Sequence, residues 1–211
     1  PMSRFDFDPP TPDDSPGCEA RTQALLESLE ERILVLDGAT GTGLQDEHLT
    51  AADFGGPALE GCNENLCRTR PDVVVRLHER YLAAGADIIE TNTFSGTTIA
   101  MADYNMEDLV YELNYESARL AREVADEFTE KEPDKPRFVA GSMGPTNKTA
   151  SLSPDVNDPG YRAVTFDELR AAYKQQAEAL LDGGADLVIF ETFADLEELL
   201  IGIRTVRTLH S

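Results

Sequence analysis

Hydrophobic residues follow two alternating patterns along the chain. Short, largely apolar runs lie at residues 33–36, 87–90, 138–141 and 187–191. Segments with apolar residues at helical spacing follow them, at residues 71–84, 109–128, 165–181 and 195–206. Strands without polar alternation are buried on both faces, as in a parallel sheet. The pattern therefore predicts an α/β fold of four βα units.

Boundary residues support three of the predicted helices. Pro71 stands at a first helical position, and Gly85 supplies the stop at the other end. Thr165 and Asp195 each precede a Glu by three residues, which is the spacing of a capping box. These signals indicate where the helices begin and end.

The segments outside this pattern differ in character. Residues 1–20 are dominated by Pro, Asp and Ser, so we expect a disordered or loosely attached start. Residues 21–31 are compatible with a short leading helix. Two long irregular stretches, 41–67 and 142–164, follow predicted strands, and loops of this length are often functional.

One sequence segment occurs twice. Residues 85–94 (GADIIETNTF) return as residues 184–193 (GADLVIFETF), and each copy reads as a strand that ends in Glu-Thr. Four βα units can form a small doubly wound sheet or half of an eight-stranded barrel. The repeat and the long loops favour the half barrel. Because a half barrel has two open edges, we expect either a fragment or a chain that pairs with itself.

The charge of the chain argues against some classes of partner, and its hydrophobicity argues against a membrane location. The chain carries 40 acidic and 18 basic residues, a net charge of −22, which argues against nucleic acid as a partner. A halophile-like solvated surface explains the excess, so helical acids such as Glu197 and Glu198 are expected to face solvent. No apolar run approaches the roughly 20 residues that span a bilayer, and residues 1–16 lack the apolar core of a signal peptide. We expect a cytoplasmic protein without a membrane partner.

The cysteines do not form a recognisable metal or disulfide pattern. Cys18, Cys62 and Cys67 are too few for a disulfide framework in a chain of this size. The spacing of the last two permits a metal pair, but no further ligand lies near them in the sequence. Free thiols in a reduced compartment are the favoured interpretation.

Candidate chemistry gathers at the carboxyl ends of the predicted strands. Asp37, Glu90 and Glu191 end three of them, and three carboxylates at one rim can hold an ammonium group or serve acid–base chemistry. The glycine-rich turn after Asp37 is a tight turn or a cradle for a ligand. Small residues around Gly144 leave room at the rim, where Asn147 offers an uncharged donor and acceptor.

Longer motifs carry a family resemblance. Residues 36–42 (LDGATGT) and 85–94 resemble a homocysteine S-methyltransferase domain. Residues 144–154 (GPTNKTASLSP) and 156–159 (VNDP) are similar to the amino-terminal homocysteine-binding domain of cobalamin-dependent methionine synthases. The resemblance runs from about residue 32 to about residue 207.

The resemblance implies a (β/α)8 TIM-type barrel, of which residues 21–211 would supply about the first four βα units as an amino-terminal half. It implies homocysteine as substrate, activated as a zinc-bound thiolate, with methyl passing from methyltetrahydrofolate through cobalamin to homocysteine. Folate and cobalamin domains and the other barrel half would be partners outside this chain. Self-association through the open barrel edges is an alternative.

Carried over by position, Asp37 and Glu191 match acidic residues that hold the homocysteine amino group. The candidate substrate-binding residues are Asp37, Gly38, Ala39, Thr40, Gly41, Glu90, Thr91, Asn92, Thr93, Phe94, Gly144, Asn147 and Glu191. The family's zinc-ligand cysteines would lie beyond Ser211. We therefore expect this fragment to bind neither zinc nor cobalamin and to be inactive alone.

Two other interpretations stay open. The chain could belong to a cobalamin-independent homocysteine methyltransferase that uses another methyl donor, although residues 144–159 favour the methionine synthase type. It could also be a non-catalytic, self-paired α/β module.

Overall fold

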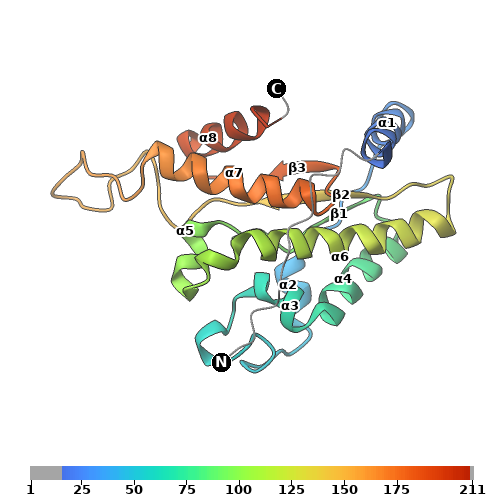
Figure 1. The fold of residues 1–211 in the computed structure, drawn as a ribbon, viewed down its shortest axis with the longest axis horizontal. Helices are drawn as coiled ribbons and strands as arrows, with labels where there is room; N and C mark the ends of the chain where they lie inside the picture. Colours follow the sequence, from blue (N-terminus) through green and yellow to red (C-terminus); the bar gives the residue numbers. More distant parts are fainter. Residues whose placement is uncertain (1–15, 210–211) are drawn as a thin grey trace.

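The computed structural model describes residues 16–209, which form eight α-helices around a parallel sheet (Figure 1). The strands are β1 (Ile88–Glu90), β2 (Phe138–Met143) and β3 (Leu187–Phe190). The helices are α1 (Pro16–Glu31), α2 (Thr40–Gln45), α3 (Leu66–Thr69), α4 (Pro71–Ala84), α5 (Thr98–Met101), α6 (Val110–Lys131), α7 (Phe166–Asp182) and α8 (Leu196–Arg207). Short 3₁₀ helices lie at η1 (Pro57–Leu59), η2 (Asn63–Asn65), η3 (Ala102–Tyr104) and η4 (Glu107–Leu109).

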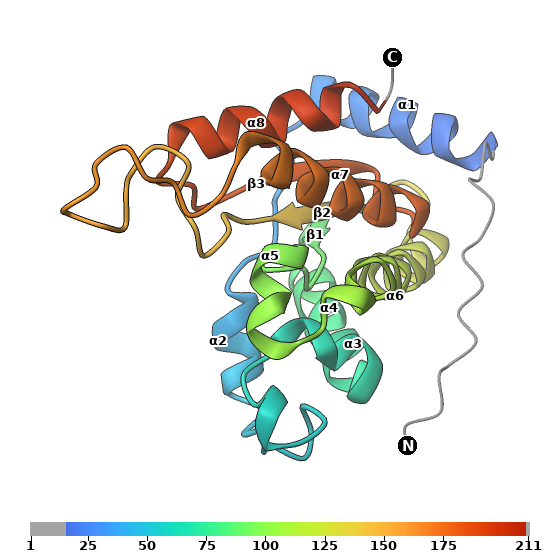
Figure 2. The ribbon, with the colours of Figure 1, turned by 60° about the vertical axis from the view of Figure 1, so that its left-hand side comes forward.

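The sheet follows the chain in order. Its strands are parallel and lie in the order β1-β2-β3, with Glu90 beside Ala140 and Ser142 beside Ile189. The helices α4, α6, α7 and α8 pack against the strands and succeed one another around the sheet (Figure 2). Because the strands are parallel, Glu90 and Glu191 both lie at the carboxyl-terminal end of the sheet, as the repeat predicts.

The main core lies between the sheet and helices α6 and α7. Every residue of β2 is buried. Small side chains on the two helices, Ala118, Ala121 and Ala177, are fully buried and let the helices approach the sheet closely. Tyr173 is the largest buried side chain of this core. The carboxyl ends of the strands are therefore held in place by tightly packed elements.

The predicted buried strand at residues 33–36 is wrong. This segment is held to β1 by a single bridge, Leu36 to Ile88, and the backbone oxygen of Val35 accepts from the amides of Asp87 and Ile88 at 2.8 and 3.1 Å. Ile33 is 91% exposed, and Val35 and Leu36 are also exposed. The run has the composition of a buried strand, but among the described residues nothing covers its outer side.

Other boundaries differ in detail. The stretch 41–67, predicted to be irregular, contains α2, η1, η2 and the beginning of α3. Helix α1 begins at Pro16 rather than at residue 21; the rest of the predicted loose start, residues 1–15, lies outside the described residues. Gly85 has φ 109°, which confirms it as the stop of α4.

The capping predictions have different outcomes. Thr165 and Glu168 form a complete capping box at α7. Asp195 caps α8 by accepting from the amides of Glu197 and Glu198, but the Glu198 side chain does not reach back. It is 1% exposed and accepts instead from the Thr146 amide at 2.7 Å and the Tyr173 hydroxyl at 2.8 Å. The expectation that Glu198 faces solvent is therefore wrong.

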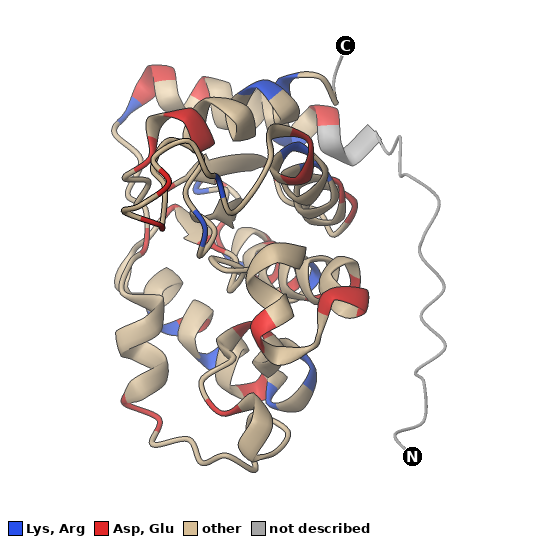
Figure 3. Ribbon diagram, turned by 90° about the vertical axis from the view of Figure 1, so that its left-hand side faces the viewer, with Lys and Arg blue, Asp and Glu red and all other residues tan. Residues whose placement is uncertain are grey.

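Acidic residues are spread over the helices and loops rather than gathered in one patch (Figure 3). The net charge of −22 is therefore distributed over the surface of the protein. In the described part of the chain, no helix is both long enough and apolar enough to cross a membrane.

Candidate functional site

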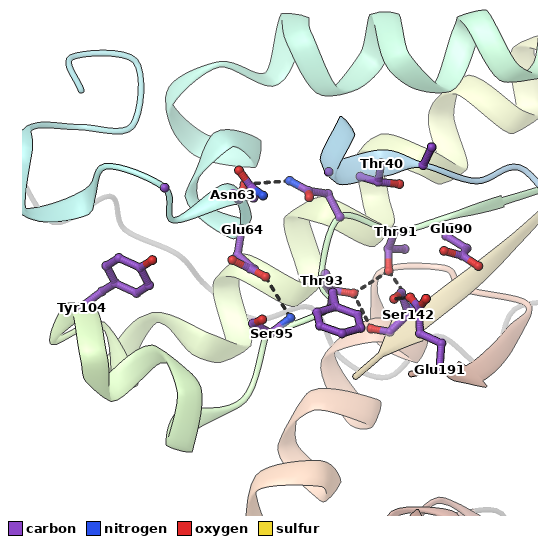
Figure 4. A pocket seen from close by; sticks show the side chains of 15 residues that line it. Thr40, Asn63, Glu64, Glu90, Thr91, Thr93, Ser95, Tyr104, Ser142 and Glu191 are labelled. Atoms are coloured by element: carbon purple, nitrogen blue, oxygen red, sulfur yellow. Dashed lines mark hydrogen bonds between the residues drawn. The ribbon is translucent and has the colours of Figure 1, made fainter. Parts of the chain in front are cut away.

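A cavity of about 380 Å³ opens at the carboxyl ends of the strands (Figure 4). Loops that follow β1 and β3, the end of β2, helix α2 and the segment around η2 contribute its walls. The lining residues are Ala39, Thr40, Gly41, Gly61, Asn63, Glu64, Glu90, Thr91, Asn92, Thr93, Phe94, Ser95, Tyr104, Ser142 and Glu191. Most of the residues proposed from sequence therefore meet in one place.

Four of the proposed residues do not line the cavity: Asp37, Gly38, Gly144 and Asn147. Asp37 lies directly behind the wall, since both of its carboxylate oxygens accept from the Glu90 amide, at 3.0 and 3.1 Å. Asn147 is turned outward and donates to the Asp103 carboxylate at 2.8 Å. Its sequence position after β2 suggested the rim, but the structure does not bring it to the cavity.

Gly144 supports the wall from outside. A Cβ atom at this position would lie 2.6 Å from the Phe94 ring, so only glycine leaves space for that ring. The Gly144 amide also donates to the Phe94 carbonyl oxygen at 2.9 Å. The residue therefore positions a cavity-lining aromatic side chain without contacting the cavity itself.

Two carboxylates, Glu90 and Glu191, lie together at one end of the cavity (Figure 4), and Asp37 lies behind them. Burial raises the pKa of Asp37 to about 7. The hydrogen bond from the Glu90 amide opposes this rise, and the neighbouring carboxylates of Glu90 and Glu191 add to it. Burial, followed by repulsion from Glu191, raises the pKa of Glu90 to about 7. Clustered carboxylates that no Lys or Arg pairs with in residues 16–209 suit a positively charged ligand group.

Hydrogen bonds between neighbouring strands fix the floor of the cavity. The Thr91 and Thr93 hydroxyls lie 2.6 Å apart, and Thr93 also donates to the carbonyl oxygen of Ser142 at 2.7 Å. The Ser142 amide donates to Thr91 at 3.0 Å, and the Ser142 hydroxyl donates to Glu191. The loop after β1 is thus tied to β2 and, through Ser142, to the carboxylate after β3.

Sequence reasoning missed the opposite end of the cavity. Glu64 is buried there, with Asn63 and Tyr104 nearby, and accepts from the Ser95 amide at 2.9 Å. Burial raises its pKa. The length of the stretch 41–67 is typical of functional loops, but no sequence spacing connects Glu64 to Ser95, which lies 31 positions later.

Two non-glycine residues near the carboxylates adopt left-handed backbone conformations. Ala39, before α2, has φ 51°, and Thr192, directly after Glu191, has φ 62°. Such a φ is unfavourable for a β-branched residue such as Thr, and strained backbones concentrate at functional sites. The conformation of Thr192 therefore marks the turn after Glu191 as a candidate functional position.

The described residues do not fit a zinc site. Across residues 16–209, no group of three or more His, Cys, Asp and Glu side chains is arranged to hold a metal ion. Cys62 and Cys67 are buried free thiols, and Cys67 donates to the Glu64 carbonyl oxygen at 3.0 Å. Burial raises the pKa of Cys62 to about 11, which disfavours the thiolate that metals require.

Comparison with known proteins agrees with the fold. Residues 34–209 match the sequence profile of the family described as homocysteine S-methyltransferase. The metallated form of the homocysteine methyltransferase MmuM from Escherichia coli is 26% identical with a TM-score of 0.68, covering 89% of this chain and 62% of that one. Its oxidized form is 27% identical with a TM-score of 0.69, covering 88% and 62%.

The apo form of MmuM is 24% identical with a TM-score of 0.61, over 85% of this chain and 57% of that one, and supports the fold alone. This chain thus spans less than two thirds of the length of these similar structures. The profile match extends over nearly all of the described residues. The chain belongs to the homocysteine S-methyltransferase family.

Proposed function

We propose that this chain is the amino-terminal, homocysteine-binding part of a methionine synthase of the cobalamin-dependent type. In this proposal the bridged segment 33–36 and the strands β1, β2 and β3 take the places of the first four strands of a (β/α)8 barrel, and residues 21–211 form one half of the barrel domain. The bridge at Leu36 and the order β1-β2-β3 support it, because consecutive parallel neighbours are what a barrel requires.

The observation that carries the proposal is the acidic end of the cavity. Glu90 and Glu191 face the cavity from the carboxyl ends of parallel strands, and Asp37 is buried behind them. We assign the homocysteine ammonium group to Glu191 at the cavity surface and to Asp37, which would support it from behind the wall through its charge. Charge-assisted hydrogen bonds of this kind contribute about 1.5–3 kcal/mol each.

The other assigned residues act through the backbone and through shape. The turn from Gly38 to Gly41 and the segment from Thr91 to Phe94 surround the amino-acid part of the substrate. Zinc, which makes the homocysteine sulfur nucleophilic when bound, would be held by cysteines beyond Ser211. Accordingly, we propose that these 211 residues alone do not transfer methyl groups.

Binding calorimetry with L-homocysteine tests the proposal. We expect the purified protein to bind L-homocysteine and not 4-mercaptobutanoate, its analogue without the amino group. Asp37→Asn and Glu191→Gln should each weaken binding by about 10- to 100-fold. Equal binding of both compounds would exclude an ammonium site at this position.

Methyl-donor assays on a protein that includes the rest of the barrel separate the alternatives. Transfer from methylcobalamin supports the methionine synthase type, and the run of residues 144–159 favours this outcome. Transfer only from another donor identifies a cobalamin-independent enzyme. If neither donor nor homocysteine is used, the non-catalytic module remains.

A further inference from the structure

Glu90 is the least compensated carboxylate of the cavity. Its backbone amide donates to Asp37, but within residues 16–209 no group donates a hydrogen bond to its carboxylate and no Lys or Arg pairs with it. By contrast, Glu191 accepts from the Ser142 hydroxyl, and both Asp37 oxygens accept from the Glu90 amide. A half-buried carboxylate without a donor is costly to keep ionised.

The charged groups that face Glu90 are acidic. Glu191 lies beside it at the end of β3, and Asp37 lies beside it at the bridge to β1. The residues that α2 and its preceding turn present to the cavity, Ala39 and Thr40 among them, carry no charge, and Glu64 stands at the opposite end. Burial and like charge thus act in one direction, and the pKa of Glu90 rises to about 7.

We propose that Glu90 is a third substrate-binding carboxylate, protonated in the empty cavity and ionised when the ammonium group of an amino acid enters. The O–H bond of the Glu90 carboxylic acid breaks, and its proton passes to solvent. The ammonium group keeps its own three protons and takes the place of the lost proton as the positive partner. This inference rests on the proposed function and assigns to Glu90 a role that the family resemblance does not give it.

The proposal predicts how affinity changes with pH. When binding requires one proton to leave, the association constant rises about tenfold per pH unit below the pKa of the free site and levels off above it. The levelling is expected near the pKa of about 7 for Glu90 and Asp37. Because the two groups interact, the observed midpoint belongs to the pair.

Calorimetry with L-methionine as the probe tests the proposal directly. L-Methionine keeps the ammonium and carboxylate groups but has no thiol, so a released proton cannot come from sulfur. At about pH 6, titrations in two buffers of different ionisation enthalpy should give release of about one proton per bound ligand. Binding of L-methionine without proton release would overturn the inference and leave the proposed function intact.

Variants assign the proton to a residue. Glu90→Gln should release at least about half a proton less than the wild type, with a shallower pH dependence, and Glu90→Asp should restore release. Glu107→Gln, which changes an exposed carboxylate on η4 outside the cavity, should behave as wild type. Unchanged release by Glu90→Gln contradicts the assignment. Failure of both L-homocysteine and L-methionine to bind rejects the proposed function and this inference together.

Discussion

At the scale of single residues, the two aspartates of the repeated Gly-Ala-Asp segment have a structural role. Asp87 accepts from the Val35 amide at 2.8 Å and pairs with Arg32. Asp186 accepts from the Val139 amide at 2.9 Å and pairs with Arg122 and Arg21. Asp87 thus ties the start of β1 to the segment 33–36, and Asp186 ties the start of β3 to β2. The repeat therefore has an anchor at its beginning and a cavity carboxylate at its end.

Asp186→Ala should lower the free energy of unfolding by about 3–5 kcal/mol, because it leaves Arg122 without its buried partner. Asp126→Ala is a matched control, since Asp126 also pairs with Arg122 but its side chain is 54% exposed, against 1% for Asp186. The control should cost no more than about 1 kcal/mol. Urea unfolding measures both, and equal losses would contradict the buried anchor.

Asp37 should make the unliganded protein less stable as pH rises. Its folded pKa of about 7 lies above its unfolded value, so between the two the native state holds a proton that the unfolded state has lost. Stability therefore falls as pH rises through this window. Asp37→Asn should raise the free energy of unfolding by about 1–3 kcal/mol at about pH 8, and the gain should shrink near pH 5.

Asp53→Asn provides a control of opposite sign. Hydrogen bonds from Thr50, followed by Arg70, lower the pKa of Asp53 to about 2. The stabilisation from Asp53 is present above its unfolded pKa and is lost as pH falls through the folded value. This substitution should therefore lower stability at pH 8, when measured by the same unfolding titration. A stability gain for both variants at pH 8 would show that net charge, rather than the local environment, governs the effect.

At the scale of secondary structure, hydrophobic spacing predicted the elements whose partners are present. Helices α4, α6 and α7 and strands β1, β2 and β3 all appear close to the expected residues. The segment 33–36 does not become a buried strand, because no described element packs on its outer side. An apolar run indicates that a segment should be buried, but it does not indicate which element buries it. Glu64 was missed and Glu198 was wrongly expected to face solvent for a related reason: their partners, Ser95 and Tyr173, lie far away in the sequence.

Asp195 connects an element to a loop. One of its oxygens caps α8, and the other accepts from the amides of Ala150 and Ser151 at 2.8 Å each. Asp195→Ala should therefore accelerate amide exchange at Ala150 and Ser151 and lower stability by about 1–2 kcal/mol. Thr165→Ala removes the cap of α7 and should leave those two amides protected. Hydrogen exchange read by NMR distinguishes the outcomes, and faster exchange in both variants would argue against a specific anchor.

At the scale of the whole molecule, the sheet ends in two edges. Residues 33–36 form one edge and β3 the other, and among the described residues neither edge has an outer neighbour strand. Beside β3 a second cavity of about 330 Å³ is lined by Leu187, Val188, Phe190 and Ile203, among others. Unpaired edges with apolar side chains favour pairing with another strand. In the proposed barrel the remaining units would cover both edges.

A chain of these 211 residues should accordingly associate with itself in solution. Val35, which is 55% exposed at the first edge, would be buried on association, and a lysine there opposes edge-to-edge pairing. Val35→Lys should weaken association by about tenfold, which corresponds to the loss of about 1.4 kcal/mol of apolar burial. Val156→Lys is the matched control, because Val156 is 90% exposed but lies in the loop before α7, away from the sheet edges. Sedimentation equilibrium over a range of concentrations measures both. A wild-type chain that stays monomeric throughout would show that its sheet edges do not mediate association. Equal weakening by both lysine substitutions would place the contact elsewhere on the surface.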